Sequence, residues 1–291
     1  MSKKFKLSDK KVTQMPKVLQ TGKAALKELC GRYQQLSGLE ERGAFVGSER
    51  DELFEMQTSE AAVLGIYFDE RADFELFIKS TVYKDKPVPK SMGACTISGL
   101  VNLQKSAAAP VSLSGAMPVS LPGATRQSFK ESLIVLSKGE YSAVPAEAVG
   151  LDKGEWLEKS LRIRLYHESA HIVCRARFAG QKRPVWDELL ADCIGLLAAF
   201  GAYDRALALR LVGIDKDGSY IGGRLENYFD DKENIGRYVS FALQQTELLQ
   251  KAALKEFGAD ASQRNSVISD GAIFDFCLKM QEAALADEGC L

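Results

Sequence analysis

The sequence predicts an α+β protein that is predominantly helical. Apolar residues recur at helical spacing through most of the chain after residue 126, whereas short apolar runs typical of buried strands occur before it. Between these parts lies a stretch rich in Pro, Ser, Gly and Ala. We therefore expect a smaller mixed α/β region at 1–104, a loop or linker at 105–125, and a helical domain at 126–291.

In the first region we expect one helix and two or three strands. Residues 18–36 place apolar side chains at helical spacing. The run at 61–68, AAVLGIYF, is continuously apolar and ends at Asp69, which is typical of a buried strand. Residues 74–83 and 95–103 are the further candidates for strands.

The stretch at 105–125 contains a tandem near-repeat, PVSLSGAM at 110–117 and PVSLPGAT at 118–125. Proline and glycine at this density interrupt helices and central strands. We interpret the stretch as a long loop or linker. A flap beside a binding site is the alternative, because long loops in compact domains are often functional.

The region after residue 126 is expected to form a set of helices. Pro184 stands where a helix would begin, and Gly201 and Gly258 stand where helices would end. Helical spacing of apolar residues covers 127–137, 153–179, 185–199, 203–211, 232–257 and 272–286.

Composition and charge exclude several classes of protein. The net charge of −1 provides no field that would favour nucleic acid or an anionic membrane. No segment approaches the roughly 18 apolar residues of a membrane span, and the first 20 residues lack the apolar core of a secretory signal. We therefore expect a cytoplasmic protein that contacts neither nucleic acid nor membrane.

Both histidines of the chain lie in one motif, HESAH, in which Glu168 follows His167 and His171 comes four residues after His167. On a helix, residues four apart share a face, so the two rings can bind one metal ion. Glu168 can then accept a proton from a metal-activated water. The alternative is a pair of ordinary, hydrogen-bonded histidines in a helix that packs in the core.

A second pair of residues can supply the third metal ligand and a partner for one histidine. Catalytic zinc takes three protein ligands and leaves one position for water. Glu188 and Asp192 are also four apart, and the short connection near 179–184 predicts antiparallel neighbouring helices. Glu188 would then complete the metal site with His171 and His167, and Asp192 would accept the free ring N–H of His167.

The pattern HExxH followed by ExxxD, within residues 167–195, resembles the gluzincin branch of zinc metallopeptidases, the thermolysin-like enzymes among them. The resemblance implies a zincin-like helical domain. It implies that His167, His171 and Glu188 bind Zn²⁺, that Glu168 is the general base, and that Asp192 supports a ligand histidine. It also implies a sheet whose edge strand aligns the substrate, which the sequence does not locate.

We therefore expect a zinc-dependent hydrolase, a metallopeptidase or amidase acting on a peptide or small amide. Such enzymes usually place a Tyr, His or Arg opposite the metal to bind the developing oxyanion. Tyr220 and Arg224, in a glycine-rich turn, are the candidates, with Tyr228 and Tyr238 as alternatives. The other interpretation of this turn is an ordinary surface loop. Cys174, one turn beyond His171, could also approach the metal, although a buried thiol is the simpler interpretation.

Two other functions fit part of the pattern. One is a metal-binding regulatory or interaction protein without turnover. A purely structural site needs no base beside its ligand, and structural zinc sites are usually closed and rich in cysteine. The other is an iron-dependent oxygenase on two histidines and a carboxylate. The compact HExxH motif followed by ExxxD favours zinc.

Overall fold

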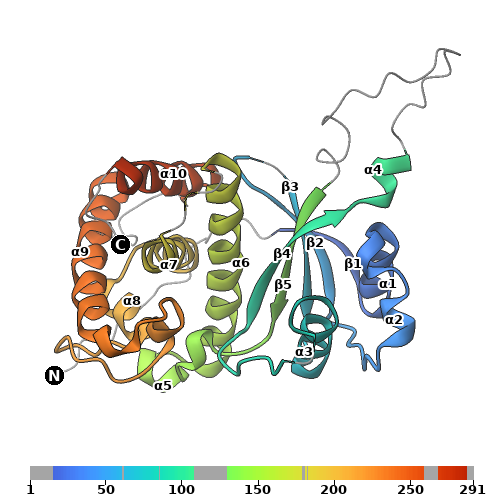
Figure 1. Ribbon diagram of the computed structural model, residues 1–291, viewed down its shortest axis with the longest axis horizontal. Coiled ribbons are helices and arrows are strands. Elements are labelled where there is room, and N and C mark those ends of the chain that lie inside the picture. Colours follow the sequence, from blue (N-terminus) through green and yellow to red (C-terminus); the bar gives the residue numbers. More distant parts are fainter. Residues whose placement is uncertain are drawn as a thin grey trace, which may run out of the picture.

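Figure 1 shows a computed structural model of the chain, which describes residues 16–60, 62–84, 86–107, 130–178, 181, 183–258 and 268–286. A five-stranded sheet forms one part, and a group of helices packs against it. The protein is α+β and predominantly helical, which confirms the predicted fold class. In the described part of the chain, no helix has the length and apolar character that crossing a bilayer requires.

The sheet has the strand order β1-β2-β3-β5-β4. Only β3 and β5 are parallel, and the other neighbours are antiparallel. Strand β4 therefore lies at an edge, with β5 as its one partner strand among the described residues. The strands are β1 (Lys17–Thr21), β2 (Glu52–Gln57), β3 (Ala62–Phe68), β4 (Ala94–Val101) and β5 (Lys130–Ser137).

Each face of the sheet has its own apolar core. Along β5, Leu133 and Val135 pack with α1 (Lys23–Arg32) and α3 (Arg71–Ile78), whereas Ile134 and Leu136 pack with the large helices. This alternation follows from the two-residue period of a strand. Figure 1 shows α6 on one side of the sheet and α1, α2 and α3 on the other.

The large helices surround α7, which is seen end-on in Figure 1. Thirteen of its seventeen residues are buried, as expected for a helix that is apolar on nearly every side. The helices of this group are α6 (Lys153–Arg177), α7 (Pro184–Phe200), α8 (Arg205–Val212), α9 (Ile235–Phe257) and α10 (Asp270–Ala286). Short elements are α2 (Leu39–Arg42), α4 (Leu103–Ala107), α5 (Ala146–Val149), the 3₁₀ turns at Gln34–Leu36, Tyr141–Ala143, Arg224–Asn227 and Lys232–Asn234, and a π turn at Lys79–Tyr83.

Two predictions for the first region are wrong. The single helix expected at 18–36 is divided, because Gly22 at φ 66° separates strand β1 from helix α1. The strand expected at 74–83 is helix α3 followed by the π turn, since Phe74, Phe77 and Ile78 have the spacing of one helical face. Strand β2 was not expected, whereas the strands expected at 61–68 and 95–103 are present as β3 and β4.

The helix expected at 127–137 is also wrong, because residues 130–137 form β5. The four residues Leu133–Leu136 are all buried, and such a continuous apolar run suits a strand covered on both faces. The sheet therefore takes strands from both sides of the 105–125 stretch. Residues 108–129 lie outside the described residues, so the choice between linker and flap remains a prediction.

Helices α6 and α7 approach each other closely at Gly195. A Cβ atom at this position would lie 2.8 Å from Cγ2 of Ile163 and 2.8 Å from its carbonyl oxygen. Both neighbours belong to a buried residue of the core. Glycine therefore sets how near the two helix axes can come.

We expect Gly195→Ala to lower the free energy of unfolding by about 1–3 kcal/mol, because the added methyl group overpacks this contact. Urea denaturation measures the change. Gly236→Ala in α9 is the matched control, since a Cβ there meets no atom within 4 Å. That variant should be neutral or slightly stabilised, and equal stability of the two variants would contradict the tight contact.

Candidate metal centre

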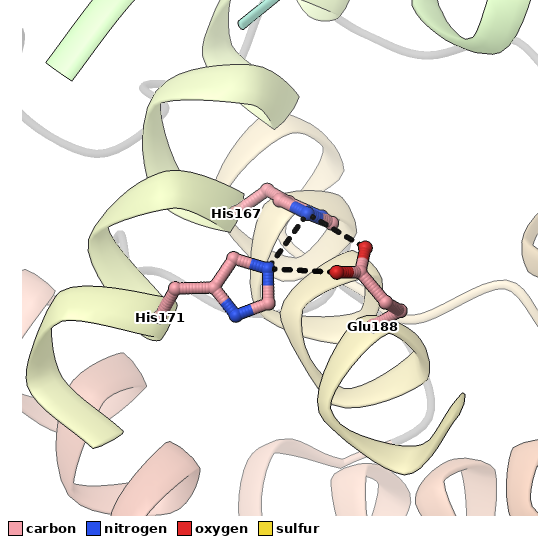
Figure 2. Close-up of side chains that lie close together, drawn as sticks. All are labelled: His167, His171 and Glu188. Atoms are coloured by element: carbon pink, nitrogen blue, oxygen red, sulfur yellow. Dashed lines mark hydrogen bonds and ion pairs between the residues drawn. The ribbon is translucent and has the colours of Figure 1, made fainter. Parts of the chain in front are cut away.

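Potential ligand atoms from three residues meet between α6 and α7. Nε2 of His167 lies 3.1 Å from Nε2 of His171. The two oxygens of Glu188 lie 3.3 Å from these nitrogens, one oxygen beside each ring. Figure 2 shows both rings of α6 turned toward the Glu188 carboxylate on α7. The two helices have the expected antiparallel arrangement, because Glu188 lies beside His171 and Asp192 lies beside His167.

The three side chains lie close enough together to share one metal ion. Atoms bound at about 2.0–2.1 Å to one tetrahedral centre lie about 3.3 Å from each other. The two ring nitrogens, 3.1 Å apart, are near this edge length, and each has its own Glu188 oxygen at 3.3 Å. One ligand atom from each of the three residues lies within 4.8 Å of the other two. His167 is buried, but the side chains of His171 and Glu188 are 13% and 23% exposed, so the group is accessible from solvent. Two histidines and one glutamate are among the donor sets of catalytic zinc sites.

A buried hydrogen-bond network contacts Nδ1 of His167. This nitrogen lies 2.9 Å from Oδ1 of Asp192 and 3.0 Å from the hydroxyl of Tyr141. The Tyr141 hydroxyl donates to the same Asp192 oxygen at 2.7 Å and accepts from Nη1 of Arg224 at 3.0 Å. The second oxygen of Asp192 pairs with Nη2 of Arg224. With Nδ1 facing the Asp192 carboxylate, Nε2 is the ring nitrogen that points toward His171 and Glu188, where a metal would bind.

The charges of this network are complementary. Burial raises the pKa of Asp192, but Arg224 and the bond from His167 bring it below its usual value. Burial likewise opposes the ionised form of Glu188, while the neighbouring His171 and His167 hold its pKa well below the usual range. Burial alone would lower the pKa of His167, but hydrogen bonds to Asp192 and Glu188 raise it to about 10. Both carboxylates are therefore ionised at neutral pH.

Sequence reasoning missed Tyr141, because it lies 26 residues before His167 in a 3₁₀ turn without a recognisable motif. Its turn includes Ser142 and Ala143 at φ 54° and 56°, a conformation that residues other than glycine rarely adopt. Such a backbone needs support from the surrounding structure.

Helix α6 provides this support. Ser160 accepts a hydrogen bond from the Tyr141 amide at 2.9 Å, and the Trp156 indole donates to the carbonyl of Val144 at 2.7 Å. The buried Arg164 guanidinium donates to the carbonyls of residues 139 and 140 at 2.6 and 2.7 Å. Residues 156, 160 and 164 are each four apart and share one face of the helix. The same helix thus carries the histidines and fixes the turn that orients one of them.

The four candidates for an oxyanion-binding residue have different positions. The Tyr220 hydroxyl bonds within its own turn, to Gly223 at 2.9 Å and Glu226 at 3.2 Å, so it is not part of the metal group. Arg224 lies against Asp192, on the side of His167 away from Nε2.

The two alternatives also separate. Tyr238 stacks on Phe229 with 3.6 Å between ring centroids. Burial raises the pKa of the Tyr228 hydroxyl well above its usual value, and the nearby Glu188 carboxylate adds to the rise, so this hydroxyl stays protonated. Of the four candidates, Tyr228 is therefore the one that lies beside a residue of the metal group.

Glu168 and Cys174 complete the surroundings. Oε2 of Glu168 accepts a hydrogen bond of 2.6 Å from the hydroxyl of Thr96 on β4. The Cys174 sulfur lies 3.6 Å from the sulfur of Cys277 on α10 and is not one of the atoms of the metal group.

Comparison with protein families gives one match. The profile of a family of unknown function (DUF7005) covers residues 40–272, which include strands β2 to β5 and helices α6 to α9. The chain belongs to this family. No curated protein and no solved structure matches the chain. The DUF7005 description names no activity, so the function has to be argued from the chemistry of the site.

We expect Arg224→Met to lower the free energy of unfolding by about 3–5 kcal/mol at pH 7, because it leaves the Asp192 carboxylate buried without its cation. Because the pKa of Asp192 is lowered in the folded protein, its stabilising contribution is present above the ordinary value of 3.8 and is lost as pH falls. The difference between variant and wild type should therefore narrow in acid, as Asp192 takes up a proton in the variant first.

Urea denaturation at several pH values measures this effect. Asp192→Asn in the Arg224→Met background is the control, because it removes the uncompensated charge and should recover part of the loss. A loss below about 1 kcal/mol in the single variant would contradict the role given to the ion pair.

Proposed function

We propose that this member of the DUF7005 family is a zinc-dependent hydrolase acting on a peptide or small amide bond. The observation that carries the proposal is the group of His167, His171 and Glu188, whose ring nitrogens and carboxylate lie close enough together to share one zinc ion. The resemblance of HExxH and ExxxD to gluzincins supports the same assignment.

The acid–base work falls to Glu168. When bound, zinc lowers the pKa of a coordinated water and polarises a substrate carbonyl. Glu168 accepts a proton from the attacking water while the water oxygen forms a bond to the carbonyl carbon. Glu168 then returns that proton to the leaving nitrogen as the C–N bond breaks. Of the four candidates, Tyr228 is the one beside Glu188, so we assign its hydroxyl to stabilise negative charge on the carbonyl oxygen.

Strand β4 favours a peptide as the substrate. It is an edge strand of the described sheet, and its residue Thr96 touches Glu168. The free edge of a strand can pair with an extended peptide through backbone hydrogen bonds. A peptide paired in this way would run beside the proposed base, as the gluzincin resemblance implies.

We also place the protein in the cytoplasm. The five cysteines within the described residues are all free thiols, including Cys174 and Cys277 with sulfurs 3.6 Å apart. A nearby pair that stays reduced is typical of a reducing compartment.

Metal content is the first test. Protein purified without added metal should contain about one zinc per chain by elemental analysis. His167→Ala should contain almost none, because a site with three protein ligands loses most of its affinity when one of them is removed. Iron in place of zinc would favour an oxygenase. No metal, and no uptake from micromolar zinc, would overturn the hydrolase proposal.

Glu168→Gln separates catalysis from metal binding. The variant should keep its zinc, because the three ligands are untouched, and should lose roughly 10²–10⁴-fold in kcat, since general acid–base catalysis typically contributes that much. A library of peptides and small amides screened with the wild type supplies the assay. Equal activity of the variant and the wild type would exclude Glu168 as the base, and a zinc-loaded wild type that hydrolyses no substrate would favour a metal-binding protein without turnover.

A further inference from the structure

Thr96 connects the sheet directly to the proposed base. Its hydroxyl lies 2.6 Å from Oε2 of Glu168, although the two residues are 72 positions apart. Thr96 is half-buried and pairs with Ile134 of β5, so its backbone is held by the sheet. Glu168 is 9% exposed on α6. The contact therefore joins two rigid elements.

The chemistry of the contact favours one orientation of the carboxylate. A hydroxyl that donates to a carboxylate forms a short, charge-assisted bond of about 2.5–2.7 Å, roughly twice as strong as a neutral one. The bond occupies Oε2. Within the described residues, Oε1 of Glu168 accepts no hydrogen bond. One oxygen is thus anchored and the other is available to hold a water.

An unanchored base would be less effective. A glutamate side chain has several rotatable bonds, and a displacement of about 1 Å of a reacting group can cost 10²-fold in rate. The neighbouring ligands do not restrain Glu168, because their interactions are with Glu188 and Asp192. The hydroxyl from β4 supplies the missing restraint.

We propose that Thr96 is a positioning residue that holds the Glu168 carboxylate with one oxygen free for the attacking water. This inference rests on the proposed hydrolase function. Thr96 neither binds the metal nor donates a proton to the substrate. Its effect should therefore appear in kcat and not in zinc content.

The kinetic test compares three variants. Thr96→Val keeps the shape of the side chain without its hydroxyl, and should lower kcat about 10- to 100-fold with KM and zinc content within twofold of wild type. Thr96→Ser restores the hydroxyl and should recover kcat to within about threefold. Thr81→Val is the control. Thr81 is also half-buried and donates one hydrogen bond of 2.7 Å, to the carbonyl of Phe77, but it lies on the other side of the sheet from α6.

A second readout does not use activity. Crystals of Thr96→Val grown without added metal should show the Glu168 carboxylate in more than one conformer, whereas wild type and Thr96→Ser should show one. If Thr96→Val does not fold, Thr96→Ala serves both measurements.

The outcomes separate the two proposals. Unchanged kcat in Thr96→Val, or a single unmoved Glu168 conformer, would overturn the role of Thr96 while an inactive Glu168→Gln kept the hydrolase proposal intact. A loss that Thr96→Ser does not rescue would also overturn it, because the hydroxyl would then not be the active feature. Absence of zinc or of hydrolysis in wild type would instead count against the hydrolase itself.

Discussion

Helix α6 packs on the sheet with one side and on α7 with another, and its closeness to α7 sets the geometry of everything around it. At Gly195 the two helices approach until Ile163 leaves no space for a Cβ atom. One turn further along α6 and nearly one turn back along α7, the same approach brings His167 against Asp192. A wider spacing would leave Glu188 too far from the two rings to share an ion with them. The dimensions of the site are therefore a property of helix packing and not of a flexible loop.

The second constraint is the burial of charge. Asp192 is 1% exposed, and it is stable there because Arg224, Tyr141 and His167 all donate to it or pair with it. A buried ion pair adds little net stability compared with a well-packed apolar core, but an incomplete one is costly. The network therefore selects a single arrangement. His167 is held in the orientation that a metal ligand requires.

The sequence predicted the parts of the site that depend on local geometry. The spacing of His167, His171, Glu188 and Asp192 reports directly on one helix and its antiparallel neighbour, so the contacts among them could be anticipated. Tyr141 and Thr96 reach the same region through a 3₁₀ turn and a strand, and no local pattern marks either. The error at 130–137 has a related cause, since short apolar runs fit a helix or a buried strand equally well until the partners are known. Tyr220 and Arg224 follow the metal helices in the sequence, but Tyr220 bonds within its own turn, and Arg224 pairs with Asp192 behind His167.

The position of β4 in the sheet has a consequence for how far the protein can be divided. This strand precedes the proline- and glycine-rich stretch in the chain, yet its one partner among the described strands, β5, follows that stretch. During synthesis, β4 must wait for residues 130–137 before it can join the sheet, and closing that loop costs conformational entropy. A gene cut between the two halves would leave β4 with no neighbour and an apolar strand β3 with one side uncovered. The stretch that looks like a boundary in the sequence therefore lies between two paired strands of one sheet, and the helices that carry the candidate metal centre do not form a separate module.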